Sequence, residues 1–298
     1  MHARKLLPFV PSVALALAAL APAAAETDVP SPAQVVPQRL IETMGGTAAA
    51  GPAVDVELIA TLSHGGETGP VQWTVLERSS DETGDIVARG QGASLGASLR
   101  PGDYVAHIAL AGTSIVRPFA VSDQGGPAPF ALEIGGMSLA ASSAGEPLGT
   151  TDAVEFTIYD TDGERKAIRR GVAPDETVVL PAGVYRAVVR YGEHNALTGA
   201  DIRVRPGEVT HATLGVSGAP VRLSLVREPG ARAALAAVSW RVFDDGGKPI
   251  MESDEPSPAL VLAPGAYTAE ALHDGWTGVH RFEVKSGEPL DLKLPVDG

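Results

Sequence analysis

The chain has 298 residues, no cysteine, and 23 basic against 36 acidic residues, which gives a formal net charge of -13. The missing cysteines exclude disulfide crosslinks, thiol catalysis and thiolate metal sites, so each folded part depends on its own hydrophobic core. The acidic surface repels phosphate backbones and anionic lipids, which disfavours nucleic acids and charged membrane surfaces as partners.

Residues 1–25 are typical of a secretory signal peptide. Arg4 and Lys5 precede an apolar run, and three alanines before Glu26 offer a small-residue cleavage site. We therefore expect a periplasmic or secreted protein with no stable membrane span after cleavage. The alternative is that the apolar run is retained as an anchor, although its two prolines favour export.

A linker is predicted next, over residues 26–53. This stretch is rich in Pro, Ala and Gly and has neither a helical nor a strand period, apart from one possible helical turn around Gln38 to Met44.

Three units of similar sequence follow the linker. Each opens with an alternating strand, at residues 54–62, 137–142 and 221–226, and continues with a strand centred on an aromatic residue. These aromatic residues are Trp73, Phe156 and Trp240, at steps of 83 and 84 residues. Period-two alternation predicts one buried face, and the aromatic side chain is expected to fill the centre of a small core.

A six-residue phrase marks the same place in every unit. LRPGDY at 99–104 returns as LPAGVY at 180–185 and LAPGAY at 262–267, so the tyrosines are 81 and 82 residues apart. Pro and Gly predict a turn, and the tyrosine opens the inward face of the next strand. In immunoglobulin-type sandwiches a tyrosine at such a corner bonds nearby backbone through its hydroxyl, and we expect that role here. The positions are Gly102, Gly183, Gly265, Tyr104, Tyr185 and Tyr267.

About seven short strands per unit, frequent turn residues and no long helix predict an all-β chain of three tandem antiparallel β-sandwich repeats, Ig-like or transthyretin-like. Short connections such as residues 218–220 indicate limited reach between neighbours and a semi-rigid rod. The predicted division is a signal peptide at 1–25, a linker at 26–53, and repeats at 54–135, 136–218 and 219–298.

The pattern L-x-x-G-x-Y, an alternating strand, then F-x-V-x-x-G-E resembles the small modules called PEGA, carboxypeptidase-regulatory-like or transthyretin-like domains. Residues 262–267 and 282–288 carry the resemblance best, and 180–185 with 205–208 follow. The first unit departs from it, with SDQGG in place of Gly-Glu. The resemblance implies non-catalytic spacers, binding modules or assembly platforms of the bacterial envelope.

A search for chemistry finds no metal site and no cofactor site. DTDGE at 160–164 contains carboxylates at calcium-loop spacing, but it follows the Phe156 strand as DDGGK at 244–248 follows the Trp240 strand, so a hairpin turn is the simpler interpretation. His273 and His280 flank a predicted hairpin and could face one another, which leaves a metal ion one ligand short. No hydrolase motif occurs, and the chain is predicted not to be an enzyme.

Trp276 is the best candidate for a binding residue. Unlike Trp73 and Trp240 it lies outside the repeated core position, at the tip of HDGWTGVH beside His273, Asp274 and His280. An exposed tryptophan could stack on a sugar ring or anchor a protein, whereas a tryptophan folded over its own sandwich would be structural.

These observations favour an exported, acidic, non-catalytic tandem-repeat protein that acts as a binding, spacer or assembly module, with an envelope protein or a glycan as partner. One alternative is a carbohydrate-binding protein that uses Trp276. A second is a hydrolase or metal-dependent enzyme whose site is assembled from loops of several units.

Overall fold

The computed structural model describes residues 49–65, 68–78, 83–161, 166–228 and 236–296. The predicted signal peptide and most of the predicted linker lie outside these ranges, as does most of the DTDGE loop. The described residues are strands and turns without a helix, which confirms the all-β prediction, and so none of them forms a helix able to span a membrane. They group into two compact units, the first mainly up to Phe130 and the second mainly from Ala131 onward.

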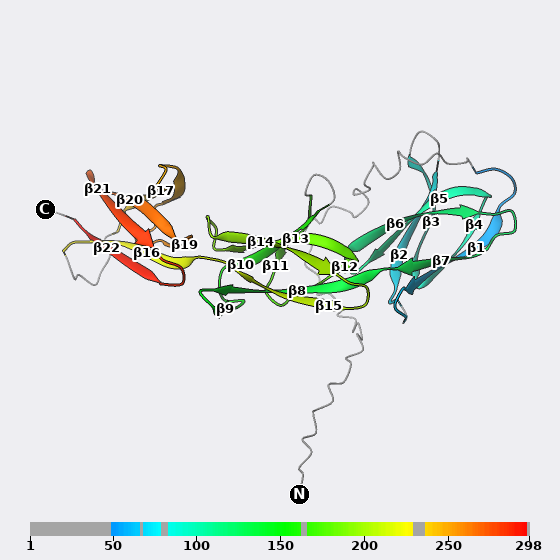
Figure 1. Ribbon diagram of the computed structural model, residues 1–298. Helices are drawn as coiled ribbons and strands as arrows, with labels where there is room; N and C mark the ends of the chain where they lie inside the picture. The colour runs from blue at the N-terminus through cyan, green and yellow to red at the C-terminus, as the bar shows by residue number, and fades with distance from the viewer. Residues whose placement is uncertain (1–48, 66–67, 79–82, 162–165, 229–235, 297–298) are drawn as a thin grey trace, which may run out of the picture. The chain divides into compact units, whose positions relative to one another are not determined.

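The first unit contains one sandwich of two sheets (Figure 1). The tryptophan strand occupies the middle of the larger sheet, where both of its edges are paired. The three-stranded sheet has the order β4–β1–β7, formed by β4 (Ser94–Leu99), β1 (Val54–Leu62) and β7 (Gly126–Leu132). The four-stranded sheet has the order β3–β2–β5–β6, formed by β3 (Thr83–Gly92), β2 (Val71–Arg78), β5 (Gly102–Leu110) and β6 (Thr113–Val121).

The second unit begins with another sandwich of the same design. Its smaller path is β12–β8–β15, with β12 (Thr177–Pro181), β8 (Ile134–Ser143) and β15 (Val209–Gly215), and the short β9 (Glu146–Leu148) also pairs with β8. The four-stranded sheet is β11–β10–β13–β14, with β11 (Ala167–Val172), β10 (Val154–Asp160), β13 (Gly183–Tyr191) and β14 (Leu197–Val204).

The last sandwich also belongs to the second unit. Its three-stranded sheet is β19–β16–β22, with β19 (Ala259–Leu262), β16 (Ala219–Val226) and β22 (Leu290–Pro295). Its four-stranded sheet is β18–β17–β20–β21, with β18 (Pro249–Ser253), β17 (Ser239–Asp244), β20 (Gly265–His273) and β21 (Trp276–Val284).

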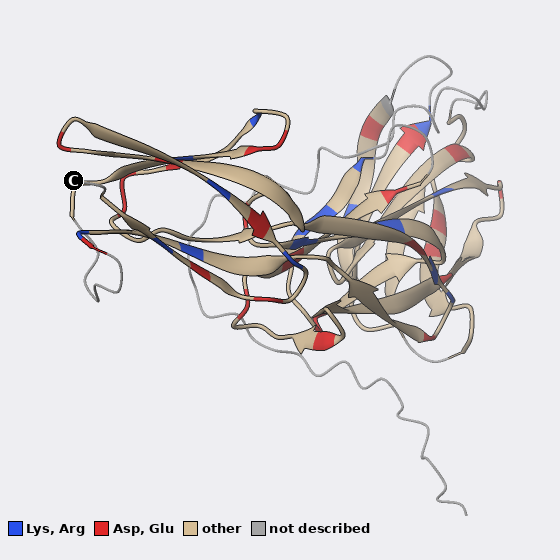
Figure 2. Cartoon of the chain, turned by 60° about the vertical axis from the view of Figure 1, so that its left-hand side comes forward, with Lys and Arg blue, Asp and Glu red and all other residues tan. Residues whose placement is uncertain are grey.

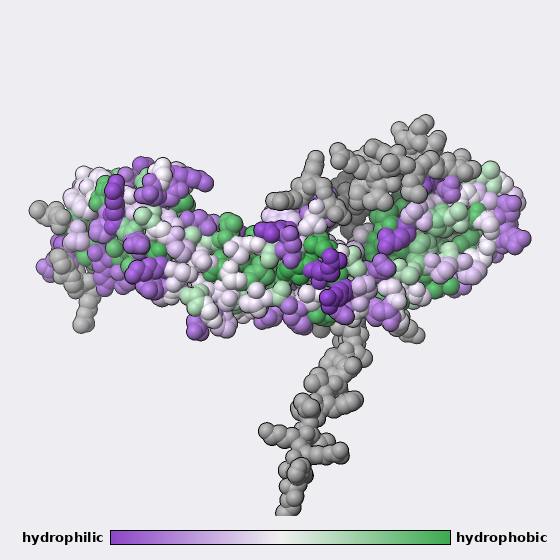
Figure 3. Space-filling view, viewed as in Figure 1, coloured by the Kyte–Doolittle hydropathy of each residue, from purple (hydrophilic) through white to green (hydrophobic). Residues whose placement is uncertain are grey.

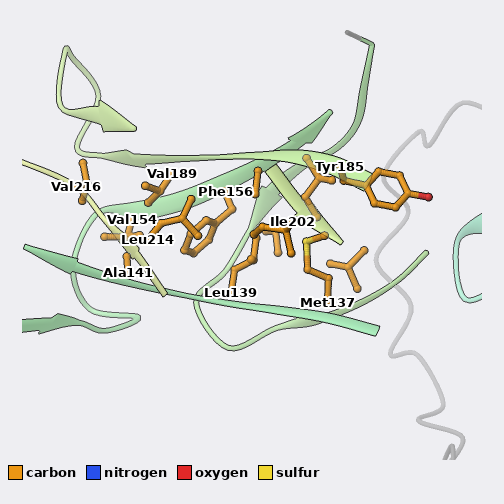
Figure 4. Close-up of a cluster of buried hydrophobic side chains, with 14 of the residues drawn as sticks. Met137, Leu139, Ala141, Val154, Phe156, Tyr185, Val189, Ile202, Leu214 and Val216 are labelled. Carbon is orange, nitrogen blue, oxygen red and sulfur yellow. The ribbon is translucent and has the colours of Figure 1, made fainter. Parts of the chain in front are cut away.

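Alternation of buried and exposed residues explains why these segments form strands. In β10, Val154, Phe156 and Ile158 are buried and the residues between them are not. Phe156 lies inside a cluster drawn from both sheets, which includes Leu139 of β8 and Ile202 of β14 (Figure 4). Each sandwich is thus two half-buried sheets closed over one apolar layer.

Two strand pairings were not foreseen from the sequence. The strand pairs of the four-stranded sheets in the second unit are antiparallel, but β8 pairs with β15 in parallel, and β16 pairs with β22 in parallel. In each case the first strand of the sandwich lies beside its last strand. Alternation predicts which face of a strand is buried, and it carries no information about the neighbour that the strand selects.

Candidate functional site

The hairpin β20–β21 holds the four residues that the sequence singled out for binding. His273 and Trp276 are its last paired residues, and Asp274 and Gly275 form the tip, with φ of 47° and 81°. Two consecutive positive φ angles are those of a type I′ turn, for which Asp-Gly is a preferred pair. The tip is therefore built by ordinary hairpin chemistry, and it fixes where Trp276 lies.

Trp276 is only partly buried, whereas Trp73 and Trp240 are each 1% exposed. Its side chain packs against the core of the last sandwich, and its ring lies over Gly278, two residues along the strand, where an added Cβ would collide with the ring. Part of the indole therefore supports the end of its own sandwich, and the remainder is open to solvent. The structural interpretation therefore describes part of this side chain, and the binding role of Trp276 stays a prediction.

The polar neighbours of Trp276 do not converge. His273 Nδ1 lies 3.2 Å from the carbonyl oxygen of Ala237, and its Nε2 lies 3.5 Å from the carboxylate of Asp274, which is 87% exposed. His280 pairs with Ala269, four strand positions away from His273. The idea that the two histidines face one another across the hairpin is therefore wrong, because the register sets them apart along the strands.

No group of three or more His, Asp or Glu side chains suited to a metal ion occurs in the described ranges. What the hairpin tip offers is a partly exposed indole beside an imidazole and a carboxylate. On the other face of the same strands, Leu272 is 49% and Val279 is 63% exposed. Such a mixture can take part in stacking and apolar contact with a ligand.

The corner tyrosines are placed alike in the three sandwiches. Each hydroxyl donates to the carbonyl oxygen four residues upstream: Tyr104 to Arg100 at 2.7 Å, Tyr185 to Pro181 at 2.8 Å, and Tyr267 to Ala263 at 2.9 Å. Their rings are buried, and Figure 4 shows Tyr185 at one end of its core with the hydroxyl directed away from it. This bond ties each turn to the strand that follows.

The Gly-Glu turns have a matching role in the second unit. Gly207 N–H donates to the carbonyl of Ile134 at 2.8 Å, and Gly287 N–H donates to the carbonyl of Gly218 at 2.9 Å, so each turn holds the entry of its own sandwich. Both glycines have φ near 73–74°. In the first unit Gly125 N–H instead donates to Ser122, which lies within its own turn.

The Asp-Gly segment at 244–248 is a hairpin turn. Asp244 Oδ1 accepts a hydrogen bond from Lys248 N–H at 2.9 Å, and the backbone of Asp244 bonds with Gly247 and Lys248. Its carboxylate therefore serves the turn between β17 and β18. The corresponding DTDGE segment is described only at Asp160 and Thr161.

A shallow depression lies on the first unit, over the β4–β1–β7 sheet. Asp55 and Glu57 of β1 stand opposite Ser98 and Gly96 of β4, whose small size leaves the space. Both carboxylates are exposed. Solvent of high dielectric around them screens their charges, so the depression gives no argument for catalysis.

Sequence reasoning missed Asn195. Its Nδ2 donates to the hydroxyl of Tyr267 at 2.8 Å, and its Oδ1 accepts from Ala263 N–H at 2.9 Å, so it joins the last two sandwiches within the second unit. A signal was present: five residues, 192–196, separate β13 from β14, whereas two separate β20 from β21. An insertion at a single repeat is a place to look for a contact specific to that repeat.

Acidic and basic residues are interspersed along the strands and loops that the structure describes (Figure 2). The face in Figure 3 carries hydrophobic residues in several separate groups between hydrophilic ones.

Comparison with known proteins gives one family match. Residues 220–295 match the Rhizobiales growth-associated tandem repeat domain, which covers the last sandwich. No curated protein matches the sequence.

Several solved structures resemble the chain at low identity. The Bacillus anthracis TIE protein is 15% identical, with 83% of this chain and 50% of that chain covered and a TM-score of 0.24. A streptococcal ancillary pilin is 13% identical over 80% of this chain and 98% of its own, with a TM-score of 0.26. BcpA, the major pilin subunit of Bacillus cereus, is 10% identical over 82% and 99%, with a TM-score of 0.23. The chain thus spans half the length of the first of these, and likenesses at such scores carry no functional argument.

Proposed function

We propose that this chain is an exported, non-catalytic protein of the bacterial envelope, in which tandem β-sandwich modules act as a spacer and as a binding or assembly platform. One observation carries the proposal: the residues that recur in the three sandwiches have structural roles, either in the hydrophobic core or at the corner turn. Trp73, Phe156 and Trp240 are buried, and the three corner tyrosines each hold a turn. The match of residues 220–295 to a tandem repeat domain supports the modular part of the proposal.

The proposed modules are residues 54–135, 136–218 and 219–298, after a cleaved signal peptide and a linker. Kinship with PEGA or carboxypeptidase-regulatory-like modules remains part of the proposal and rests on the turn motifs. Amino-terminal sequencing of the protein recovered from cells tests the export step. We expect the mature chain to begin at Glu26 in a periplasmic or secreted fraction, and an uncleaved chain in the cytoplasm would contradict it.

The binding role is tested by chemical crosslinking of the tagged mature chain in its native envelope, followed by mass spectrometry of the crosslinked peptides. The expected result is one envelope partner crosslinked reproducibly to a defined face of a sandwich. An enzymatic activity of the purified chain that is lost on mutation of a defined residue cluster would overturn the non-catalytic proposal.

Carbohydrate recognition is the second candidate, and the partly exposed indole of Trp276 beside His273 and Asp274 favours it. The test is a glycan array with the mature chain, the Trp276→Ala variant and, as a control, Thr277→Ala from the neighbouring exposed position. Binding that is lost in Trp276→Ala alone would support this candidate, and binding that all three proteins share would reject Trp276 as its origin.

A further inference from the structure

The end of the middle sandwich fits one particular kind of corner. The surface consists of Tyr191, Gly192, Asn195 and Ala196, at the loop between β13 and β14, and is called here the corner socket. Asn195 uses both ends of its side-chain amide: Oδ1 accepts from Ala263 N–H, and Nδ2 donates to the Tyr267 hydroxyl, which itself donates to the Ala263 carbonyl. The amide therefore forms hydrogen bonds with both the backbone and the tyrosine of the same corner.

Apolar contacts surround these hydrogen bonds. Val261 and Ala263, from the strand and turn that lead into the corner, pack against the hydrophobic core of the middle sandwich. The fit is close, since a Cβ added at Gly192 would come within 2.6 Å of Val261 Cβ, and one added at Gly218 would come within 2.9 Å of Ala196 Cβ. At Gly218 this proximity alone favours glycine, whereas at Gly192 a φ of 73° favours glycine as well.

The connecting segment is held from both sides as well. The carbonyl of Gly218 accepts hydrogen bonds from Ser143 Oγ at 3.0 Å and from Gly287 N–H at 2.9 Å. Ser143 belongs to the middle sandwich and Gly287 to the last one. The carbonyl between them is thus fixed relative to both, which removes freedom that a glycine connection would otherwise have.

The three corner sequences differ in what they can offer to Asn195. The residue after the leucine is Arg100 in the first, Pro181 in the second and Ala263 in the third. Proline has no backbone N–H, so the second corner cannot supply the donor that Asn195 Oδ1 accepts. One backbone hydrogen bond therefore separates the third corner from the second, whereas the first corner, with Arg100, carries the same N–H donor as the third.

We propose that the corner socket is a specific interaction surface whose partner is an L-x-x-G-x-Y corner with an N–H after the leucine, and that in this chain it locks the last sandwich onto the middle one as a single rigid body. The proposal is independent of any envelope partner or glycan, because it depends on contacts within the second unit alone. Asn195 is its positioning residue, through its two hydrogen bonds to Ala263 and Tyr267.

The experiment uses the mature chain, residues 26–298, with three single variants. Asn195→Ala removes the amide, Ala263→Pro removes the N–H and installs the residue that the second corner carries naturally, and Glu193→Ala is the control from an exposed position in the same loop. Nitrogen-15 relaxation measures whether the last two sandwiches tumble together, and amide hydrogen exchange is followed at Ala263 in the wild type, Asn195→Ala and Glu193→Ala.

In the wild type and in Glu193→Ala we expect one shared tumbling time for the two sandwiches. In Asn195→Ala we expect Ala263 to exchange roughly tenfold faster, the size of one net hydrogen bond, and the two sandwiches to tumble separately, as they also should in Ala263→Pro. An unchanged indole signal of buried Trp240 shows that the last sandwich remains folded. Separate tumbling in the wild type, or unchanged exchange at Ala263 in Asn195→Ala, would overturn the proposal.

Discussion

Tyr104 donates its hydroxyl proton to the carbonyl oxygen of Arg100, with 2.7 Å between the two oxygens. Burial, together with the charge of Glu77, raises the pKa of the Tyr104 hydroxyl above its usual value of 10.0. The group therefore stays protonated under physiological conditions and remains a donor. A turn that is held by a permanently protonated phenol does not depend on pH in the range where proteins usually work.

The first prediction concerns this bond. Tyr104→Phe keeps the ring and removes the donor, which should lower the stability of the first unit by about 1 kcal/mol, the net value of one such hydrogen bond. Hydrogen exchange of the β5 amides measures the loss. Tyr159→Phe, the same chemical change at a half-buried position of β10, is the control. Equal losses of stability in the two variants would show that the hydrogen bond at the corner does not stabilise the first unit.

The two core tryptophans should respond differently to the same substitution. Trp73 Nε1 donates to the carbonyl of Gly92 at 3.0 Å, whereas Trp240 Nε1 is buried and has no partner among the described residues. Both changes to Phe create space, but only Trp73→Phe also removes a hydrogen bond. We expect Trp73→Phe to destabilise its sandwich by roughly 1 kcal/mol more than Trp240→Phe does. Chemical denaturation, monitored by hydrogen exchange, compares the two variants. A larger loss of stability in Trp240→Phe than in Trp73→Phe would contradict this account.

A methyl group at Gly278 should displace the ring of Trp276. Since an added Cβ collides with the indole, Gly278→Ala should push the ring toward solvent. In protein labelled with 5-fluorotryptophan, we expect the fluorine signal of Trp276 to shift and to become more accessible to solvent. The signals of Trp73 and Trp240 should stay unchanged, and Thr277→Ala serves as the control. An unmoved Trp276 signal would show that the ring is not held over Gly278.

We predict that His107 makes the first unit less stable in acid. Burial lowers the pKa of His107 below the usual 6.5, and its Nε2 has no hydrogen-bond partner among the described residues. As the pH falls through 6.5, the unfolded chain binds a proton that the folded chain does not yet accept, so stability falls until the folded pKa is reached. His107→Gln should remove this contribution. Thermal unfolding at pH 7.5 and pH 5 checks it, and an equal loss of stability in both proteins would argue against His107.

The strands and their buried faces were predictable because each depends on the hydrophobic pattern of a short stretch of sequence. In β10 the residues Val154, Phe156 and Ile158 recur at period two, and the first strand was expected and is found at 54–62. Counting back from Phe282 in β21 by the same period of two places Trp276 on the inward side of the strand. This indication was missed because the residues around Trp276 resemble a loop.

What the sequence could not supply depends on distant partners. Asn195 lies 72 residues from Tyr267. The longer loop at 192–196 marks a place for a contact specific to that repeat, but nothing in it identifies Tyr267 as the partner. The parallel pairing of β8 with β15 is of the same kind, since the strand chosen as neighbour depends on the packing of the whole sandwich. The separation of His273 from His280 follows from a register that only the turn at Asp274 and Gly275 fixes.

The parallel pair also has a mechanical consequence. The chain enters the middle sandwich along β8 and leaves along β15, and the pairing runs from Gly136 with Val209 to Ser142 with Gly215, so entry and exit lie at opposite ends of the ladder. Tension along the chain would load the hydrogen bonds of this ladder in shear, all together, and would not open them one after another. Single-molecule pulling should show high rupture forces for this sandwich, governed by its unfolding rate, and gradual unzipping at low force would contradict the expectation. In a protein stretched between two anchoring points, the first and last strands of the middle sandwich, β8 and β15, would bear the load.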